Sequence, residues 1–378
     1  MTPAGRPRPA TDVVAVARLM RQALRGGAVG RMTVPMRQVV EDGSGVRFLS
    51  MPAVSADLAL CVNKTATIGD GPGPTVTSVV SVFSTTTGEL LGVLDGAIVT
   101  NLKCAAVTAV VTDRCAARSS TVLGIVGSGV QAWQQYLGVS AVREITHVRI
   151  HSRTPAHAEA LRARVLAEGR ARAVVCASAE EATSGADIVS TATTSVLPLP
   201  IAADLPEHVH INCVGAHTPW SRELPRALLA SATLVVEDIG TAVAEAGEIH
   251  RTAIDLESLE SGGHTGLDGR PTVFSSTGHA SLDLITCARL VAADRSYGPG
   301  VTERPVDSAT VTASGSAAAM DTATGIGTDT DAVGREFAAA LGRLGIEMPP
   351  DLAPGVLAGY RSLRASTELL REVENMDV

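Results

Sequence analysis

The chain has 378 residues, of which 45% are hydrophobic, 19% are charged and only 2% are aromatic. Its formal net charge is -8 at pH 7, and it contains no cluster of Lys and Arg. Nucleic acid is therefore not an expected partner, because binding to a phosphate backbone needs such clusters. With so few aromatic rings, Val, Ala, Leu and Ile must fill the interior, which is typical of a parallel sheet packed between helices.

The cysteines and the apolar runs favour a reduced, cytoplasmic protein. The six cysteines have no CxxC pair or other metal-ligand spacing, so no metal site is expected. Most of them lie inside apolar segments, where Cys acts as a small hydrophobe. No uninterrupted apolar run reaches the roughly 18 residues that a membrane span needs. Arg18 interrupts the first short apolar stretch, so a signal peptide is not expected either.

The first third of the chain predicts a helix and then a mixed segment. Residues 11–26 carry Val and Leu at helical spacing. Residues 34–100 contain short β-branched runs separated by Gly-Pro loops, which indicates an α+β segment. A helix rich in Ala and Val is expected at about 101–117. The expected strands of the α+β segment are 47–52, 58–64, 75–83 and 90–94.

From residue 120 the pattern changes to strand, turn and helix, repeated. Alternation of this kind, with mostly apolar strands, predicts a doubly wound parallel sheet. The expected strands are 121–127, 145–152, 172–178, 185–194, 208–215, 233–238 and 272–278.

The composition changes again after about residue 300. Residues 306–331 are mostly Ala, Thr, Ser and Gly with little to bury, which predicts a flexible linker. A helical tail is expected at 332–378, with helices at 332–346 and 356–373.

The sharpest motif is "GIVGSGVQA" at 124–132, a G-x-G-x-x-A frame formed by Gly127, Gly129 and Ala132. The first glycine permits a tight turn, the second lets the backbone approach a pyrophosphate, and the alanine permits close packing of helix on strand. The helix that starts at Val130 and Gln131 would offer free N–H groups to phosphates. Because the motif closes a β-branched strand and opens a helix, it predicts a dinucleotide site.

The end of the second strand favours NADP(H) over NAD(H). An NAD site usually has an acidic residue there, whereas this chain has Ser152, Arg153 and Thr154. A guanidinium and two hydroxyls could bind a 2′-phosphate. In the alternative interpretation, Arg153 is a solvated loop residue and Thr154 caps the next helix ahead of Pro155.

Three Ser/Thr- or Gly-containing loops each follow a strand of the predicted sheet, at 190–194, 214–217 and 275–278. Ligands of such folds bind beyond the carboxyl ends of the strands, so we expect these loops to line the nicotinamide. Such residues are also good turn formers, which is the simpler explanation. The cofactor contacts expected here are Thr191, Ala192, Thr193, Gly215, Ser276 and Gly278.

Taken in order, several segments give the chain a specific resemblance to the ornithine cyclodeaminase/μ-crystallin family over about residues 11–305. They are "VPMRQVV" (34–40), "MPAVSADLALCVNK" (51–64), "LLGVLDGAIVTNLKCAAVTAV" (90–110), the glycine motif, "HSRTPAHAEA" (151–160), "INCVGAHTPWSRELP" (211–225) and "AEAGEI" (244–249).

The resemblance implies an α/β fold in which a Rossmann domain is inserted into an α+β domain. Residues 1–118 and 280–305 would form the substrate-binding and dimerisation domain, and residues 119–279 the Rossmann domain. A homodimer is implied as well. The helical tail is an addition to this pattern. It weakly resembles the small helical accessory subunits of amidases, so it could recruit a protein partner, or pack on its own chain.

The resemblance also places three basic residues, Arg37, Lys64 and Lys103, in a substrate pocket, with Lys64 in a catalytic position as well. Basic groups fit an amino or imino acid, whose carboxylate they can clamp. At the third position the family normally has an arginine. Lys103 therefore keeps the charge and loses the bidentate fork.

His217 stands where the cyclodeaminases of this family have a catalytic aspartate. A histidine titrates near neutral pH and can give a proton to a nitrogen as hydride reaches an imine carbon. The substitution favours hydride transfer to or from a C–N bond, with His217 as acid and base. Two alternatives stay open: an ornithine cyclodeaminase-type ammonia-lyase that recycles NAD, and a cofactor-binding protein without catalysis. His217 could also serve only as a hydrogen-bonding loop residue.

Overall fold

The computed structural model describes residues 9–41, 45–69, 76–215, 218, 222–262 and 269–296. The chain divides into two compact units, Met1–Val301 and Thr302–Val378. The whole second unit, and with it the expected linker and helical tail, lies outside the described residues.

Within the described ranges, the first sheet is antiparallel and has five strands in chain order. Strands β2 to β4 each run for nine residues, and side chains alternate between a face covered by two helices and a face that no described element covers, here called the uncovered face. The covering helices are α2 (Gly96–Cys115) and α9 (Ala280–Ser296). The strands are β1 (Gln38–Glu41), β2 (Arg47–Ser55), β3 (Leu60–Ile68), β4 (Val76–Ser84) and β5 (Leu90–Asp95).

The second sheet is parallel, and its described part has eight strands in the order β12-β11-β13-β10-β9-β6-β7-β8. This is the predicted doubly wound sheet, here β6 (Val122–Val126), β7 (His147–His151), β8 (Arg172–Val175), β9 (Ile188–Thr191), β10 (His210–Cys213), β11 (Thr233–Val236), β12 (Ile254–Asp255) and β13 (Thr272–Ser275). β6 pairs with both β7 and β9. The chain order of the strands therefore reverses beside β6, where ligands of such sheets bind.

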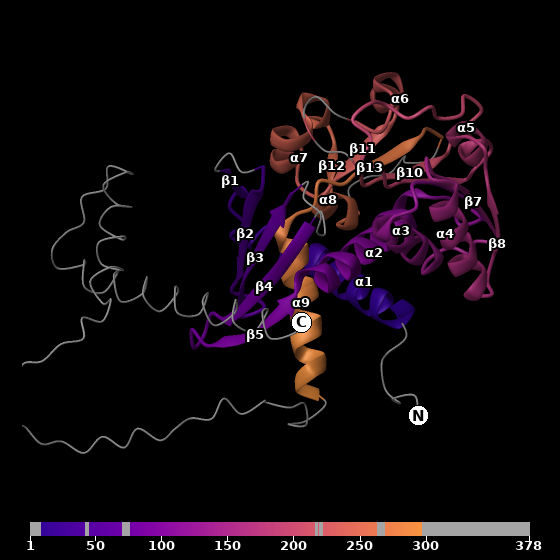
Figure 1. Ribbon diagram of the computed structural model, residues 1–378. Helices are drawn as coiled ribbons and strands as arrows, with labels where there is room; N and C mark the ends of the chain where they lie inside the picture. The colour runs from indigo at the N-terminus through magenta and orange to yellow at the C-terminus, as the bar shows by residue number, and fades with distance from the viewer. Residues whose placement is uncertain are drawn as a thin grey trace, which may run out of the picture. The chain divides into compact units, whose positions relative to one another are not determined.

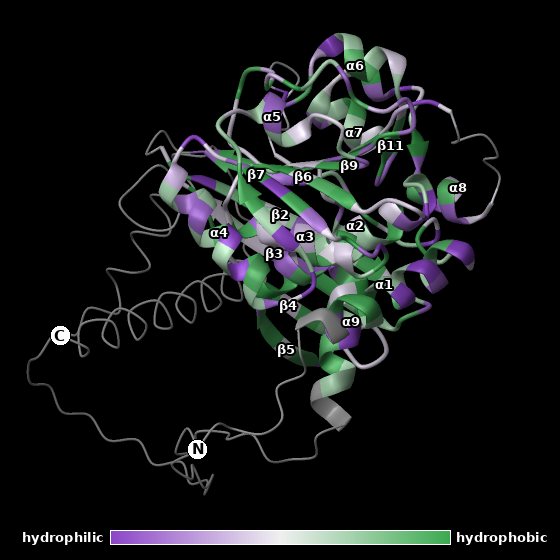
Figure 2. Ribbon diagram, turned by 90° about the vertical axis from the view of Figure 1, so that its right-hand side faces the viewer, coloured by the Kyte–Doolittle hydropathy of each residue, from purple (hydrophilic) through white to green (hydrophobic). Residues whose placement is uncertain are grey.

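Helices connect the parallel strands and cover the sheet (Figure 1). They are α3 (Val130–Ser140), α4 (Pro155–Ala167), α5 (Ala179–Thr183), α6 (Arg226–Ser231), α7 (Ile239–Ala246), the 3-10 turn η1 (Glu248–His250) and α8 (Leu256–Glu260). The strands are apolar because both faces of the sheet are covered, and the hydropathy colours show this along β6 and β9 (Figure 2). None of the described helices is long and apolar enough to cross a membrane.

Helix α1 (Pro9–Arg25) confirms the first predicted helix and packs on α2 and α9. Its apolar stripe includes Val16, Met20 and Leu24, all of them buried. The seven strands of the parallel sheet that have four or five residues lie within their predicted segments. β1 and the two-residue β12 were not singled out as strands, because their short sequences carry no periodic pattern of their own.

The two sheets are joined through the contact between α2 and α3 (Figure 1). Gly138 on α3 lies so close to α2 that a Cβ there would stand 2.4 Å from the carbonyl oxygen of Ala105. The Thr108 hydroxyl of α2 donates to Gln135 Oε1 of α3 at 3.0 Å. The backbone contact explains why glycine occurs in the last turn of α3.

Gly138→Ala is expected to lower the free energy of unfolding by about 2 kcal/mol, because the overpacking outweighs the gain in helix propensity. Gly92→Ala is the matched control, since a Cβ at Gly92 meets nothing within 4 Å. Urea unfolding followed by circular dichroism measures both changes. Equal stability of the two variants would contradict the proposed close contact.

Candidate functional site

The glycine motif forms a tight turn between β6 and α3. Gly127 has φ 117°, and a Cβ there would lie 2.3 Å from the carbonyl oxygen of Ala192. Its N–H donates to the carbonyl of His151 at 2.8 Å. Gly129 precedes α3, and a Cβ there would meet nothing within 4 Å. The turn therefore leaves open space at a helix N-terminus, which is the arrangement that a pyrophosphate requires.

The residues expected near a ribose lie beside this turn. The Ser128 hydroxyl donates to Ser152 Oγ at 2.8 Å, which ties the turn to the end of β7. Arg153 and Thr154 are exposed. Thr154 is the N-cap residue of α4, with Pro155 following it, but its side chain makes no capping hydrogen bond. Both Arg153 and Thr154 are thus available at the carboxyl end of β7.

The first two residues of α3 differ in their contacts. Val130 is 60% exposed, whereas Gln131 is half-buried and its side-chain amide donates to Asn101 Oδ1 of α2 at 3.2 Å. Gln131 therefore connects the predicted cofactor turn to the helix that carries Lys103.

Glu223 connects the loops that follow β9 and β10. Its carboxylate accepts hydrogen bonds from Thr191 Oγ1 at 2.8 Å, from Thr193 Oγ1 at 2.6 Å and from the Thr193 N–H at 2.7 Å. It also accepts from the Gly215 N–H at 2.8 Å and from Cys213 Sγ at 3.6 Å. A Cβ at Gly215 would lie 2.2 Å from the Glu223 carboxyl carbon, so glycine is required there.

Glu237 plays a similar part in the loop after β13. Its carboxylate accepts from the hydroxyl of Ser276 and from the N–H groups of Thr277 at 3.1 Å and Gly278 at 3.2 Å. Gly278 has φ 76°, and a Cβ there would lie 3.2 Å from Lys103 Nζ. The loop is therefore held by a buried carboxylate on one side and faces a buried ammonium on the other.

The guanidinium of Arg37 contacts the same loop. It donates to the carbonyls of Thr277 at 2.9 Å and Gly278 at 3.0 Å. Its Nε lies 2.5 Å from Glu245 Oε1. Burial raises the pKa of Glu245 to about 7, against the opposing charge of Arg37. In this structure Arg37 is thus bound to Glu245 and to the loop.

Two buried lysines share one buried carboxylate. Lys64 Nζ on β3 and Lys103 Nζ on α2 lie 3.6 Å and 3.7 Å from Asp283 Oδ1 on α9. Lys64 also donates to Thr100 Oγ1 at 2.5 Å. Two ammonium groups facing one carboxylate leave a local excess of positive charge, which a bound anion would balance.

The two lysines differ electrostatically. Burial lowers the pKa of Lys64, and the charge of Lys103 lowers it further, against Asp283. Burial also opposes the charge of Lys103, but Asp283, Cys104 and Glu237 outweigh it and raise the Lys103 pKa. Lys64 is therefore the one of the pair that gives up a proton more readily.

His279 follows this loop and was not expected at the site. Its Nδ1 lies 2.7 Å from Ser281 Oγ, and burial lowers its pKa. His279 and Glu237 line a cavity of about 620 Å³ on the α1 side of the loop. The only sequence signal for it was its position directly after the "SSTG" turn.

The structure thus brings together most of the expected residues. The 276–278 loop, Arg37, Lys103 and Lys64 form one connected cluster. Thr191, Ala192, Thr193 and Gly215 form a second one with the glycine turn. His217 lies outside the described residues. Sequence reasoning missed the carboxylates of Glu223, Glu237, Glu245 and Asp283. Glu223 and Glu245 lie within the segments 211–225 and 244–249 that carry the family resemblance, but nothing local marks their roles, because their partners lie far along the chain.

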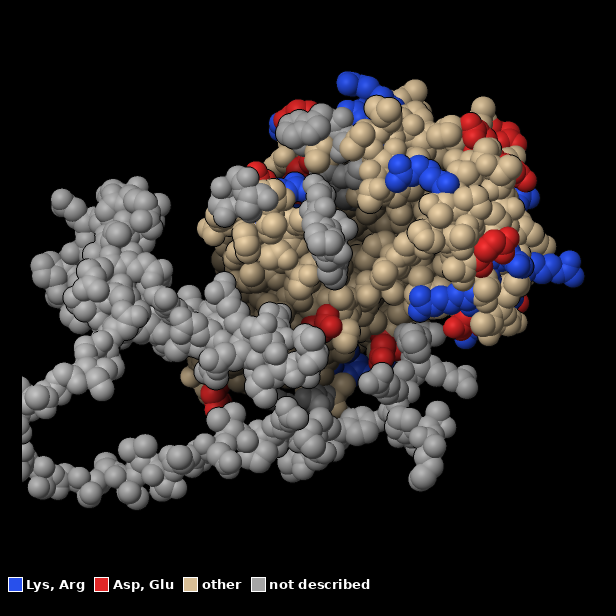
Figure 3. Space-filling view, viewed as in Figure 1, with Lys and Arg blue, Asp and Glu red and all other residues tan. Residues whose placement is uncertain are grey.

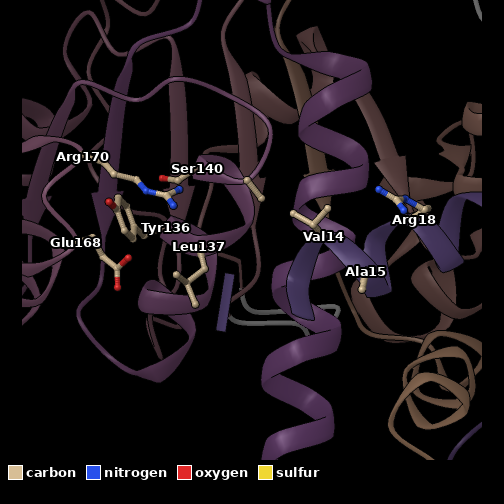
Figure 4. A pocket seen from close by; sticks show the side chains of 9 residues that line it. Val14, Ala15, Arg18, Tyr136, Leu137, Ser140, Glu168 and Arg170 are labelled. Carbon is tan, nitrogen blue, oxygen red and sulfur yellow. The ribbon is translucent and has the colours of Figure 1, made fainter. Parts of the chain in front are cut away.

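A second cavity, of about 450 Å³, lies between α1 and α3 and contains none of the expected site residues. Figure 4 shows Val14, Ala15 and Arg18 of α1 on one side of it, and Tyr136, Leu137 and Ser140 of α3 on the other. Ser140 is the last residue of α3, whereas the glycine turn precedes its first. At 1.5 Å per residue, the α3 residues that line this cavity lie about 9–15 Å along the helix from the predicted cofactor turn.

Comparison with known proteins matches residues 10–296 to the "Ornithine cyclodeaminase/mu-crystallin family". The ketimine reductase mu-crystallin of Rattus norvegicus is 34% identical over 274 residues, which is 70% of this chain and 86% of that protein. A Delta(1)-pyrroline-2-carboxylate reductase of Bacillus cereus is 33% identical over 245 residues, covering 61% of this chain and 74% of that protein.

Among solved structures, the Delta(1)-pyrroline-2-carboxylate reductase of Thermococcus litoralis, in complex with NADH and L-proline, superposes with a TM-score of 0.70. It is 25% identical, and the match covers 75% of this chain and 94% of that one.

Lys64→Met and Lys103→Met are expected to change the free energy of unfolding in opposite directions at pH 7, by roughly 1 kcal/mol each. Folding lowers the pKa of Lys64, so its charged form is disfavoured in the folded state and its removal stabilises. Folding raises the pKa of Lys103, so its removal destabilises. Urea unfolding at pH 7 measures both variants against the parent protein.

The same experiment at pH 10 separates the two lysines further. The charge of Lys64 destabilises the folded state less as the pH rises from its lowered pKa towards the ordinary value of 10.5. The increase in the free energy of unfolding caused by Lys64→Met should therefore shrink. The contribution of Lys103 is fully present below 10.5 and is lost only above it, so the loss from Lys103→Met should persist. Parallel behaviour of the two variants would contradict this assignment.

Proposed function

Because the chain belongs to the ornithine cyclodeaminase/mu-crystallin family, we propose that it reduces a small cyclic imino acid with NAD(P)H, or oxidises the matching amino acid in the reverse direction. The observation that carries this proposal is the pair of buried lysines that share Asp283 beside the 276–278 loop. Such an excess of positive charge at the carboxyl edge of a dinucleotide-type sheet suits a substrate that carries one carboxylate.

Lys64 and Lys103 bind the substrate carboxylate, and Asp283 keeps both ammonium groups in place. Arg37 joins them from the other side of the 276–278 loop. It would have to leave Glu245 to do so, or act by fixing the loop through its two carbonyl contacts. Lysines make single-point contacts with a carboxylate, so orientation of the substrate depends on several of them acting together.

Reduction of an imine needs a hydride at carbon and a proton at nitrogen. A bound reduced nicotinamide supplies the hydride, and the residues of the chain supply the proton. His217 is the proposed acid, because an imidazole can both donate and accept a proton. Lys64, with its lowered pKa, is the second group of the site suited to proton transfer.

The cofactor contacts follow the sheet. The N–H groups at the start of α3, from Gly129 to Gln131, would bind the pyrophosphate, while the loops that contain Thr191 to Thr193, Gly215, Ser276 and Gly278 would line the nicotinamide. NADP(H) is preferred over NAD(H), because Ser152, Arg153 and Thr154 follow β7 where a 2′-phosphate would lie. Arg153 and Thr154 are exposed, so their side chains are available to bind it.

Purified protein is expected to oxidise NADPH when it is given a five- or six-membered cyclic 2-carboxy imine, and to do so faster than with NADH. The absorbance of the reduced nicotinamide follows the reaction. Imines without the carboxylate are the control, since the lysine pair has nothing to bind in them. Release of ammonia from ornithine or lysine without net consumption of cofactor would instead identify a cyclodeaminase, and binding of cofactor without any turnover a non-catalytic protein.

His217→Asn is expected to lower kcat at least a hundredfold, because it removes the proton donor, and to leave the affinity for NADPH nearly unchanged. Steady-state kinetics and fluorescence titration measure the two quantities. An undiminished kcat would assign the proton transfer to another group, for which Lys64→Met is the next variant to examine.

We also propose that the chain is a homodimer that uses the uncovered face of the antiparallel sheet. This face carries large side chains that are at least about one-third exposed: Val40, Phe48, Val54, Val79, Phe83, Leu90 and Val93. Figure 3 shows few charged side chains over strands β2 to β4, whereas Lys, Arg, Asp and Glu gather around the parallel sheet. An apolar patch of this kind is typical of an interface.

Val79→Glu is expected to convert the dimer into a monomer, because it places a charge in the middle of that face. Val174→Glu is the matched control, since both residues lie on strands and are 49% and 53% exposed. Light scattering after size exclusion gives the mass of each variant. A dimer that survives Val79→Glu would place the interface elsewhere.

We propose domain boundaries between residues 118 and 119 and between residues 279 and 280. The antiparallel sheet precedes the first boundary, and the parallel sheet lies between the two. The cytoplasmic location and a protein partner bound through residues 332–378 stay predictions from the sequence.

A further inference from the structure

The carboxylate of Glu223 is fully buried and has only neutral hydrogen-bond partners in the described structure. Two hydroxyls, two backbone N–H groups and one thiol surround it. None of the ion pairs found among the described residues includes Glu223. A buried charge is normally paired with an opposite charge, and no described cation forms an ion pair with this one.

The place of this charge suggests the explanation. Its partners Thr191, Thr193 and Gly215 belong to the loops that follow β9 and β10 at the carboxyl edge of the sheet. Ala192 between them lies against Gly127 of the cofactor turn. In the proposed function these loops border the nicotinamide, whose ring is neutral when reduced and carries one positive charge when oxidised.

We propose that Glu223 is a positioning residue whose negative charge, acting through the 191–193 and 215 loops, favours the oxidised over the reduced nicotinamide in the binding site. This inference rests on the proposed function, because it needs a nicotinamide at these loops. Its consequence is that bound NADPH becomes a stronger hydride donor, which suits the reduction of an imine.

The neutral hydrogen-bond donors around Glu223 weaken the electric field of its carboxylate without cancelling it. Hydroxyl and N–H dipoles satisfy the hydrogen-bonding capacity of the oxygens, so the carboxylate is tolerated in the interior. They carry no net charge, so part of the field still reaches the neighbouring loops. A cation at the same place would have removed that field.

The test compares the dissociation constants of NADP⁺ and NADPH for the full chain and for Glu223→Gln, which keeps the shape and removes the charge. Fluorescence titration measures NADPH, and calorimetry measures NADP⁺. Glu223→Gln is expected to weaken NADP⁺ relative to NADPH by about tenfold, the order expected for one charge acting within a protein interior. Glu223→Asp keeps the charge and disturbs the geometry, so its ratio should stay close to that of the parent.

A purely structural role of Glu223 would weaken both dinucleotides by the same factor in Glu223→Gln, and that result would overturn the inference. If Glu223→Gln does not fold, Thr193→Val takes its place. It removes one hydrogen-bond donor and so leaves the charge of Glu223 less screened. The affinity for NADP⁺ relative to NADPH should then increase, and an unchanged ratio of the two dissociation constants would also overturn the inference. If the parent protein binds neither NADP(H) nor NAD(H), the proposed function itself fails.

Discussion

At the carboxyl edge of the parallel sheet, backbone N–H groups in the loops lie beyond the strands, and the carboxylates of two buried glutamates accept their hydrogen bonds. Glu223 accepts from the N–H groups of Thr193 and Gly215, and Glu237 from those of Thr277 and Gly278. An unpaired buried N–H would cost about 1–3 kcal/mol. The loops after β9, β10 and β13 therefore have one preferred conformation, on which the rest of the site depends.

The same two carboxylates set the charge pattern of the site. Glu237 is among the charges that raise the pKa of Lys103, and the loop that it holds also receives Arg37. Across the site, Lys64 and Lys103 share the carboxylate of Asp283. One side of the site is thus suited to a carboxylate ligand, and the other, at Glu223, to a ring that becomes positive. In the proposed reductase, the first side would bind the substrate and the second would favour the oxidised cofactor.

The cluster depends on elements that are far apart in the chain. Lys64 comes from β3, Lys103 from α2 and Asp283 from α9, while Arg37 precedes β1. The close approach of Gly138 to Ala105 fixes α2 on α3, and Gln131 connects α3 to Asn101 beside Lys103. Packing between the two sheets therefore aligns the predicted substrate residues with the predicted cofactor turn.

Much of this architecture could be predicted from local sequence. The helix at 11–26, every strand except β1 and β12, and the turn at Gly127 follow from periodicity and from the steric freedom of glycine, which are properties of neighbouring residues. The buried carboxylates could not be found in this way. Glu223, Asp283 and Glu245 look like ordinary surface residues in the sequence, because the groups that compensate their burial come from other parts of the chain. The sequence by itself determined the order of elements and the cofactor turn, and the tertiary structure alone decided which charges meet there.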